Sequence, residues 1–486
     1  MSSDPTPQKV DSGTPGLDTI LHGGFLPGHA AIVTGGPGTG KTIIALQFLA
    51  ASDGKALYIG FEEREQELRR NADRLGLDLS GVSILDLSAK GDRFFSDEAY
   101  TLFSNEEVEG EELLGQIASA IEDQDIDRLV IDPLSELRSL LPDDFQFRRN
   151  ISSLFNTLND RDITTLCTAQ PSDQEAEADL QFLGNTTIEI HRSTDRRSLE
   201  VTKYRGSETA AGQHTFRIHA GSGGCVYPKI VPGDHHRETT REPLPSDVEE
   251  LNALLNGGIE RGSVTIISGP SGVGKTTTGT HFLQAAAKRD ERALAFLFEE
   301  LRSDYLYRAT QLGMDIEDLV EEGTFEVEEI EALTQSPDEF AHHVREAVEK
   351  REVEFVMIDG IAGYRLGLRG DESQEQLTRE IHGLCRYLKR MGVTVILIEE
   401  IGAITGEFTA TNTQTSYIAD NIVFLQYLEV DGDIEKAIGV LKKRFGGFEQ
   451  SLRKLRIDTG GLHVGEQLSG YRGILTGTPE QTSEDR

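Results

Sequence analysis

The amino-acid sequence predicts an α/β protein with two tandem domains, each containing a mainly parallel sheet flanked by helices. The first observation is an internal repeat: the segment LDTILHGGFLPGHAAIVTGGPGTGKT, which begins at Leu17, is matched by LNALLNGGIERGSVTIISGPSGVGKT from Leu251. The second observation is that each repeat alternates short apolar runs with longer amphipathic stretches. Buried strands that alternate with helices are typical of a parallel sheet covered on both faces.

Further landmarks extend the repeat along the chain. The run YIGFEE ends at Glu63 and FLFEE ends at Glu300, while RLVID ends at Asp132 and FVMID ends at Asp359. Landmarks that recur in the same order at nearly constant spacing indicate two copies of one domain.

We therefore predict two domains in the 486 residues, namely residues 1–235 (copy one) and 236–486 (copy two). The segment that joins them, YPKIVPGDHHRETTREPLPSD, is rich in proline and charge, as linkers are. Copy two ends in a polar tail from about residue 470, which we expect to be mobile.

The apolar runs give the predicted strands of each copy. In copy one they are HAAIVT, ALYIGF, RLVID and TTLCTA, at residues 29–34, 56–61, 128–132 and 164–169. In copy two they are SVTIIS, ALAFLF, FVMID and TVILIE, at residues 263–268, 293–298, 355–359 and 394–399. The amphipathic stretch REQELRRNADRLG, at residues 64–76, predicts a helix after the second strand of copy one.

A glycine-rich loop follows the first strand of each copy and precedes a helix. GGPGTGKT (Gly35–Thr42) and GPSGVGKT (Gly269–Thr276) both fit the phosphate-loop pattern G-x-x-x-x-G-K-[ST] in the strand–helix context that the motif requires. The glycines let backbone N–H groups surround phosphates, and the lysine reaches the β- and γ-phosphates. The residues expected to bind ATP here are Gly35, Gly38, Gly40, Lys41, Thr42, Gly269, Gly272, Gly274, Lys275 and Thr276.

Asp132 and Asp359 end apolar strands about 90 residues after each loop. A carboxylate at such a position faces the magnesium ion in phosphate-loop enzymes, where the loop Thr is the other protein ligand. We therefore expect Thr42 with Asp132, and Thr276 with Asp359, to hold Mg²⁺. The alternative is that each Asp only caps the following turn.

Two adjacent acids follow the second strand of each copy, Glu62–Glu63 and Glu299–Glu300. One acid of each pair is the predicted catalytic base, which orients and deprotonates the hydroxyl or water that attacks the γ-phosphate. The alternative is a pair of solvated acids favoured by a helix N-terminus.

Basic residues recur near the end of each copy, Lys203 and Arg205 in KYRG and Lys442 and Arg444 in KKRFG. Lysine is scarce in this chain, so its recurrence at matching places is informative. We expect these four residues to bind the γ-phosphate of ATP held by a neighbouring subunit. The alternative is that they only solvate a strand edge.

Composition excludes several classes of protein. The net charge of −35 disfavours ordinary nucleic-acid binding, because the acidic surface repels phosphate backbones. The three cysteines are scattered, which suggests neither disulfides nor a zinc site. No apolar run approaches 18 residues, and the N-terminus lacks a signal-peptide core, so a cytoplasmic protein without membrane contact is expected. Acidity combined with only 14 Lys against 34 Arg resembles the composition of salt-loving archaea.

These motifs resemble the KaiC family, the double-domain ATPases of cyanobacterial circadian clocks and their archaeal relatives. The resemblance covers about residues 12–465 and rests on the L-[DN]-x-x-x-x-GG opening, the phosphate loop, the EE and ID pairs and K-x-R in both copies. It implies tandem RecA-like domains in a hexameric double ring, with ATP and Mg²⁺ at subunit interfaces. It also implies that copy one hydrolyses ATP and that copy two transfers phosphate to its own Ser or Thr.

The family's phosphorylated Ser-Thr pair falls on Ser416 and Tyr417, counting back from Asp420. Ser416 is the candidate phosphosite, whereas the Tyr is a poor replacement for Thr because its hydroxyl lies further from the backbone. Nearby hydroxyls that could substitute belong to Thr411, Thr413 and Thr415, and Ser416 could also be an ordinary loop serine. Copy one has Gln181 at the matching position, which cannot accept phosphate.

The sequence thus predicts a Mg·ATP-dependent ATPase with serine/threonine autokinase activity in copy two, acting as a regulatory switch with an unidentified protein partner. One alternative is a regulatory scaffold whose ATP binding sets only oligomeric state and partner choice. The other is a RecA-like DNA-processing motor, which the absence of a basic DNA-facing loop disfavours.

Overall fold

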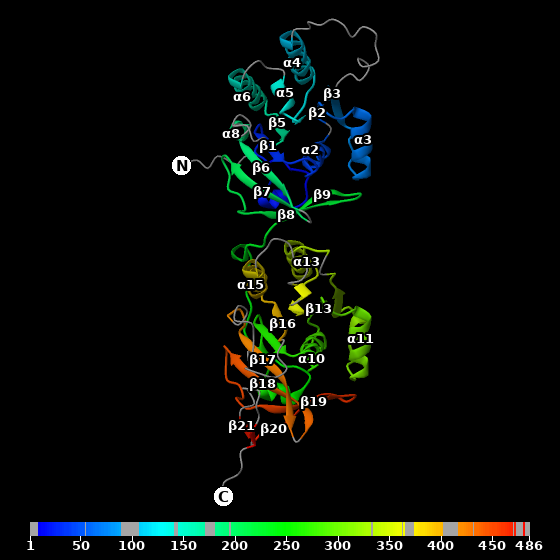
Figure 1. Ribbon diagram of the computed structural model, residues 1–486, viewed down its shortest axis with the longest axis vertical. Helices are drawn as coiled ribbons and strands as arrows, with labels where there is room; N and C mark the ends of the chain where they lie inside the picture. The colour runs from blue at the N-terminus through cyan, green and yellow to red at the C-terminus, as the bar shows by residue number, and fades with distance from the viewer. Residues whose placement is uncertain are drawn as a thin grey trace. The chain divides into compact units, whose positions relative to one another are not determined.

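The computed structural model in Figure 1 describes residues 8–53, 55–88, 106–139, 144–170, 180–193, 196–331, 334–361, 363–364, 374–401, 417–430, 432–469, 471–472 and 480–481. The chain divides into two compact units, Met1–Lys229 and Ile230–Arg486, a few residues before the proposed domain boundary. Most of the tail expected after about residue 470 lies outside the described residues.

The elements of the first unit are α1 (Leu17–Ile20), β1 (Ala30–Gly35), α2 (Lys41–Ala50), β2 (Ala56–Gly60), α3 (Glu65–Arg74), β3 (Val82–Asp86), α4 (Glu106–Glu122), β4 (Arg128–Asp132), α5 (Glu136–Ser139), α6 (Asp144–Asp160), β5 (Thr164–Ala169), α8 (Leu180–Leu183), β6 (Thr186–Arg192), β7 (Arg197–Tyr204), β8 (His214–His219) and β9 (Gly223–Tyr227).

The elements of the second unit are η2 (Pro232–Asp234), β10 (Pro243–Leu244), α9 (Glu249–Leu254), β11 (Ile259–Glu260), β12 (Val264–Gly269), α10 (Lys275–Ala287), β13 (Ala293–Leu297), α11 (Arg302–Gln311), α12 (Ile316–Glu322), β14 (Phe325–Glu329), α13 (Pro337–Lys350), β15 (Phe355–Asp359), α15 (Gln374–Arg390), β16 (Thr394–Glu400), β17 (Asn421–Val430), β18 (Asp433–Lys443), β19 (Arg453–Asp458), β20 (Gly461–Gln467), β21 (Tyr471–Arg472) and β22 (Glu480–Gln481).

Each unit is built on one large mixed sheet. The strand order is β3-β2-β4-β5-β1-β6-β7-β8-β9 in the first unit and β14-β13-β15-β16-β12-β17-β18-β19-β20 in the second. In each order the first six strands are parallel and the last three are antiparallel. The predicted α/β class with two mainly parallel sheets is therefore confirmed, and the eight predicted strands are β1, β2, β4, β5, β12, β13, β15 and β16.

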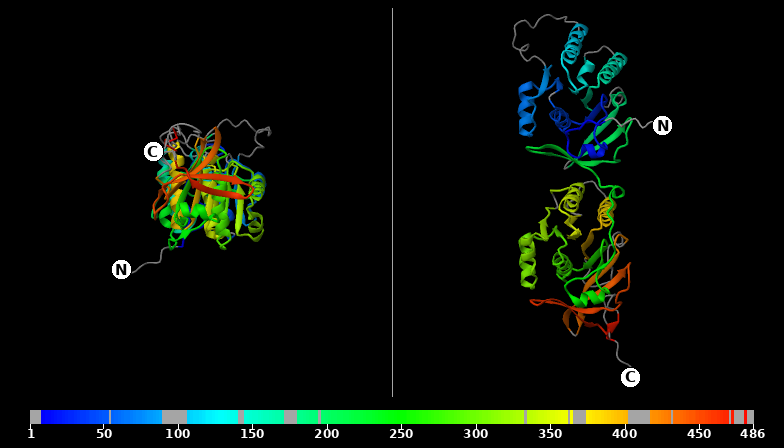
Figure 2. Two further views of the ribbon diagram at one scale, coloured as in Figure 1. Left: turned by 90° about the horizontal axis from the view of Figure 1, so that it is seen from below. Right: turned by 180° about the vertical axis from the view of Figure 1, so that it is seen from behind.

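Successive residues of the central strands point to opposite faces of the sheet, and both faces are apolar. In β1, Val33 belongs to a core with α2 and α3, whereas Ile32 belongs to a core with α4 and α6. The second unit repeats this arrangement, with α10, α11 and α12 on one face and α13 and α15 on the other. Figures 1 and 2 show helices flanking each sheet in this way. Because both faces are buried, the central strands read as continuous apolar runs.

The parallel arrangement brings several strand ends to one edge of each sheet. In copy two, β12, β13, β15 and β16 all end at the edge where the glycine-rich loop begins. Residues that follow these strands come together there although they are far apart in sequence. Among the described residues, no helix is long and apolar enough to cross a membrane.

Candidate functional site

Each phosphate loop connects the end of a central strand to the start of a helix. In copy one β1 ends at Gly35 and α2 begins at Lys41, and in copy two β12 ends at Gly269 and α10 begins at Lys275. The residue before each helix is a glycine, so no capping side chain occupies the N–H groups of the first turn. These N–H groups and the helix dipole make the loop a site for an anion.

Glycine is required at the last loop position for two reasons. The backbone φ is 109° at Gly40 and 114° at Gly274, in the left-handed region. A Cβ atom would also lie 2.9 Å from the Phe216 ring at Gly40, and 2.2 Å from Ile457 Cδ1 at Gly274. The close packing beneath the loop therefore fixes the start of the helix.

The lysine of each loop folds over the loop's own carbonyl groups. Lys41 Nζ donates hydrogen bonds to the carbonyls of Gly35 (2.7 Å) and Gly36 (3.0 Å), and Lys275 Nζ donates to Pro270 (2.8 Å). Burial lowers the pKa of both lysines, and nearby carboxylates oppose that shift. Each ammonium group is thus held where phosphates entering the loop would meet it.

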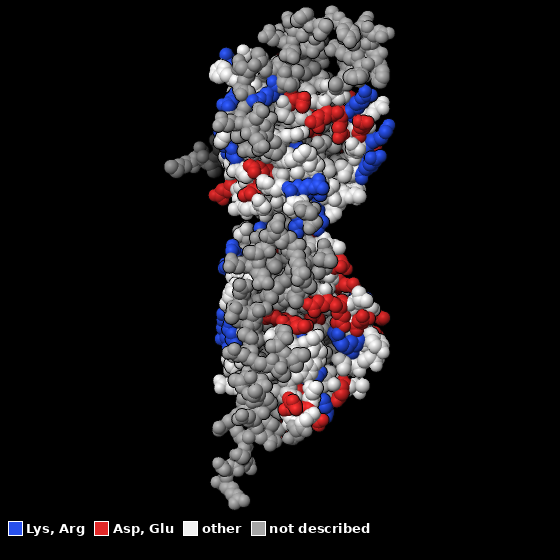
Figure 3. All heavy atoms as spheres, in the orientation of Figure 1, with Lys and Arg blue, Asp and Glu red and all other residues white. Residues whose placement is uncertain are grey.

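In copy two the predicted residues line a single cavity of about 390 Å³. Residues from the phosphate loop, from the turn after β13 and from the end of β15 contribute to it. The predicted residues among its lining are Gly272, Gly274, Lys275, Thr276, Glu299, Glu300 and Asp359. Arg308 of α11 and Glu400 of β16 also line it, and sequence analysis singled out neither. Figure 3 shows acidic side chains gathered beside α11 in this unit.

The two predicted metal ligands of copy two, Thr276 and Asp359, line the same cavity, and the Thr276 hydroxyl acts on the Asp359 carboxyl. Burial raises the pKa of Asp359 to about 6, the charges of Glu300 and Glu299 add to the rise, and Thr276 and Arg308 oppose it. A carboxylate in such surroundings favours a cation beside it.

Copy one surrounds its aspartate differently. Asp132 accepts hydrogen bonds from the Tyr58 hydroxyl (2.9 Å) and from the Thr168 hydroxyl, one on each carboxylate oxygen. Ala295 and Ile398 occupy the matching positions of β13 and β16 in copy two. Tyr58 and Thr168 were missed by sequence analysis, because each is an ordinary strand residue until the sheet pairs β2 and β5 with β4. The other predicted ligand, Thr42, is half-buried in the first turn of α2.

Within each pair of glutamates, the second is held by the helix that follows. Glu63 accepts a hydrogen bond of 3.2 Å from Asn71, and Glu300 forms an ion pair with Arg308, in both cases eight residues along the chain. The charges of the first glutamates, Glu62 and Glu299, raise the pKa of the loop lysines, and Glu299 also accepts a hydrogen bond of 3.2 Å from the Gly363 N–H. Burial raises the pKa of Glu62, with the charge of Asp132 adding to it.

The four predicted basic residues, two near the end of each copy, do not join the phosphate loop of their own copy. Lys203 pairs with Thr187, which pairs with Ile32, three residues before the loop begins at Gly35. At about 3.3 Å per residue, Lys203 lies roughly 10 Å along the sheet from that loop. Lys442 holds the same position in β18, where it pairs with Ile422.

These basic side chains instead contact backbone and acid near the opposite edge of the sheet. Lys203 Nζ donates to the carbonyls of Phe182 and Gly184, and Lys442 Nζ donates to the carbonyl of Ala419 at 2.6 Å. Arg444 forms an ion pair of 3.0 Å with the buried Asp420. Arg205 follows β7 and is exposed.

A second pair of basic residues does contact the phosphate loops. Arg197 of β7 donates to the carbonyl of Gly38 (3.4 Å), and Lys436 of β18 donates to the carbonyl of Gly272 (3.1 Å). Tyr427, opposite Lys436, donates to the carbonyl of Ser271 (3.3 Å). The repeat could have revealed these residues, because Arg197 and Lys436 differ by the same 239 positions as Lys203 and Lys442.

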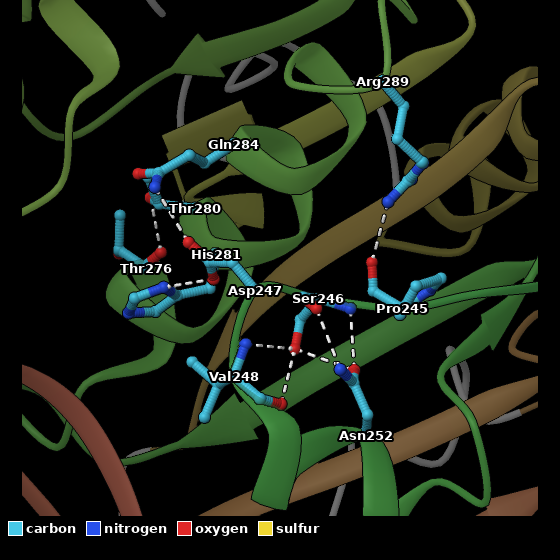
Figure 4. Close-up of polar contacts among 10 residues, drawn as sticks. All are labelled: Pro245, Ser246, Asp247, Val248, Asn252, Thr276, Thr280, His281, Gln284 and Arg289. Carbon is cyan, nitrogen blue, oxygen red and sulfur yellow. Dashed lines mark hydrogen bonds and ion pairs between the residues drawn. The ribbon is translucent and has the colours of Figure 1, made fainter.

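A polar network anchors the phosphate-loop helix of copy two to the segment before α9 (Figure 4). Asp247 accepts hydrogen bonds from His281 Nδ1 (2.6 Å) and from Gln284 Nε2 (2.8 Å), both on α10. In copy one Gln47 of α2 takes the place of His281 and pairs with the backbone N–H and C=O of Gly224. Both copies therefore fix the helix that carries the loop Thr, by different side chains.

The predicted phosphosite Ser416 lies outside the described residues, as do Thr411, Thr413 and Thr415. Gln181 belongs to the short helix α8 of copy one. Tyr417 is described and is 52% exposed, with its ring centroid 5.3 Å from that of His382.

Comparison with known proteins gives a consistent result. The family model described as "ATPase: KaiC" matches residues 10–230 and 244–469. The circadian clock protein KaiC3 of Synechocystis sp. is 26% identical over 495 residues, covering 98% of this chain and 95% of that protein. The circadian clock oscillator protein KaiC of Picosynechococcus sp. is 25% identical over 499 residues, with 98% and 93% covered. The protein of that name from Thermostichus vulcanus is 26% identical, again with 98% and 93% covered.

Proposed function

The chain belongs to the KaiC family of ATPases, as the resemblance in its motifs predicted, and on this basis we propose that both copies bind and hydrolyse Mg·ATP. The observation that carries the proposal is the cavity of copy two, where Lys275, Thr276, Asp359 and Glu299 meet. In this proposal the lysine would neutralise the β- and γ-phosphates, and the first glutamate would take a proton from the attacking water.

The protein groups around the loop fit Mg²⁺. The described residues contain no group of three or more His, Cys, Asp or Glu side chains that could hold a metal by themselves. Magnesium is usually bound by one or two protein oxygens together with waters and substrate phosphates, which is what Thr276 with Asp359 offers. The ion would neutralise charge on the phosphates, and Thr42 with Asp132 would hold it in copy one.

We further propose that the chain works as a homohexamer in the cytoplasm, as a regulatory switch with a protein partner still to be identified. The support for a ring is the position of Lys203 and Lys442, whose ammonium groups contact the carbonyls of Gly184 and Ala419 instead of the loop of their own copy. In a ring, Lys203, Arg205, Lys442 and Arg444 would approach the nucleotide of the neighbouring subunit.

Mixing two inactive variants tests this arrangement in copy one. Lys203→Ala keeps its phosphate loop but lacks the lysine for its neighbour, whereas Lys41→Ala lacks a working loop but keeps Lys203. Both variants carry Lys275→Ala, so that only copy one is measured. We expect each alone to hydrolyse ATP slowly and the mixture to recover activity, because some interfaces then combine an intact loop with an intact lysine.

Phosphate release measures the activity of that mixture, and light scattering measures its assembly. A mixture no faster than the sum of its parts, with rings present, would show that Lys203 does not act between subunits. A monomer in every condition, with ATP and across KCl concentrations, would exclude the hexamer.

We propose Ser416 as the phosphate acceptor of copy two, on the strength of its position four residues before Asp420. Ser416→Ala is expected to abolish most incorporation of label from γ-labelled ATP while hydrolysis continues, because hydrolysis by copy one does not need that hydroxyl. Mass spectrometry of the labelled protein gives the site. Unchanged labelling in the variant would point to Thr411, Thr413 or Thr415 as the acceptor. An unlabelled wild type would exclude autokinase activity and leave an ATPase or a regulatory scaffold as the function.

A further inference from the structure

Copy two carries a carboxylate beside its phosphate loop that copy one lacks. Glu400 is the last residue of β16 and pairs with Gly269, the first glycine of the loop. The next residue continues the contact, since the Ile401 N–H donates to the Gly269 carbonyl at 3.1 Å. Glu400 lines the same cavity as Lys275 and Thr276. Its place is therefore set by backbone pairing to the loop itself.

The charges around this cavity do not balance. Among the described residues that line it, four are acids, Glu299, Glu300, Asp359 and Glu400, and two are bases, Lys275 and Arg308. Arg308 is paired with Glu300. Glu400 raises the pKa of Lys275 more than either Asp359 or Glu299 does, against the lowering by burial. The loop lysine of copy two thus shares its cavity with an extra negative charge.

Copy one provides an internal comparison. Ala169 pairs with Thr34 as Glu399 pairs with Ser268, so the residue that matches Glu400 is the next one, Gln170. Glutamine has nearly the shape of glutamate but no charge. The two sites therefore differ at this point by one negative charge beside the phosphate loop.

We propose that Glu400 sets the nucleotide preference of copy two, by disfavouring the γ-phosphate of ATP and so shifting this site toward ADP. The proposal rests on the proposed function, in which the γ-phosphate lies against Lys275. The Glu400 carboxylate competes with the γ-phosphate for Lys275, and it also repels the γ-phosphate. Both effects weaken the binding of ATP. ADP lacks the γ-phosphate, so its binding is weakened less than that of ATP. Glu400 is exposed, so solvent screens part of this repulsion.

Direct binding to the full-length chain tests the proposal. Lys41→Ala removes binding by copy one, so that calorimetry with Mg²⁺ and either ADP or a non-hydrolysable ATP analogue reports on copy two. In this Lys41→Ala background we compare the chain that has Glu400 with the Glu400→Gln variant, which gives copy two the residue found in copy one. The ratio of the Kd for the ATP analogue to the Kd for ADP is expected to fall about tenfold in the variant.

The reciprocal change serves as the matched control. Gln170→Glu, with Lys275→Ala removing binding by copy two, is expected to raise the same ratio in copy one by a similar factor. Glu466→Gln, an exposed residue of β20 away from the cavity, is expected to leave the ratio of copy two unchanged.

Three results would overturn the inference. An unchanged ratio in Glu400→Gln with hydrolysis retained, whether or not both Kd values change by the same factor, would mean that Glu400 does not sense the γ-phosphate. A loss of hydrolysis with an unchanged ratio would make Glu400 a catalytic residue instead. If the Lys41→Ala chain with Glu400 intact binds neither nucleotide, the proposed function of copy two fails, and this inference fails with it.

Discussion

Replacing both phosphate-loop lysines, in a Lys41→Ala, Lys275→Ala chain, is expected to reduce ATP hydrolysis to below about one hundredth of the wild-type rate. Each ammonium group lies over the loop carbonyls at the N-terminus of a buried helix. Losing it removes a positive charge where the β- and γ-phosphates would gather negative charge during transfer. In copy two Arg308 cannot compensate, because it is paired with Glu300.

Phosphate release under steady-state conditions with Mg·ATP measures this effect. The single variants show how much each copy contributes to the total rate of hydrolysis. Lys41→Ala should remove the contribution of copy one, and Lys275→Ala should remove that of copy two. Lys288→Ala, at the exposed lysine that directly follows the same helix α10, is the matched control and should keep the wild-type rate. Wild-type hydrolysis by the double variant would contradict the assignment of both sites.

The central strands and the loops were predictable because their signals are local. β1 and β12 are buried on both faces, which gives continuous apolar runs, and the loop follows each of them directly. The repeat then doubled the evidence for every motif. The antiparallel strands gave a weaker pattern. In β7 few residues are buried, so its sequence mixes charged and apolar residues without a clear run.

The surroundings of the predicted residues were not predictable, because they depend on strand order. Glu400 follows Gly269 by more than a hundred residues, yet β16 lies beside β12 in the sheet. Tyr58 meets Asp132 in the same way, through the pairing of β2 with β4. Sequence spacing carries no signal for such contacts, since any strand order could follow from the same apolar runs. The repeat predicts two similar sites, and these non-local neighbours make them different.

Glu62→Gln and Glu299→Gln are expected to lower the turnover of their own copies by about 10²–10⁴-fold, the range typical for loss of a general base. Each is the first acid of its pair, and its charge raises the pKa of the loop lysine. The second acids are held by side chains of the following helix, Glu63 by Asn71 and Glu300 by Arg308, whereas Glu299 accepts a hydrogen bond from the backbone N–H of Gly363. Glu63→Gln and Glu300→Gln are therefore the matched controls, with the same chemistry one residue away, and should lower kcat much less.

Each copy is measured alone by inactivating the phosphate loop of the other copy. Lys275→Ala is added when Glu62 is tested, and Lys41→Ala is added when Glu299 is tested. Measuring kcat and KM separately distinguishes lost catalysis from lost binding. A base should lower kcat with little change in KM, because it acts on the attacking water rather than on bound ATP. A larger loss of kcat in Glu63→Gln or Glu300→Gln would make the second acid of the pair the base instead of the first.

The pH dependence of copy one gives an independent check on Glu62. Burial and the charge of Asp132 raise the pKa of Glu62 above its usual range. A base works only when deprotonated, so hydrolysis by copy one should be full above this raised pKa and be lost as the pH falls through it. The acid limb of the kcat/KM profile, which reports groups of the free enzyme, should therefore lie at higher pH than for an ordinary glutamate, and the residual activity of Glu62→Gln should lack that limb. An unchanged limb in this variant would assign the titration to another group and remove Glu62 as the base.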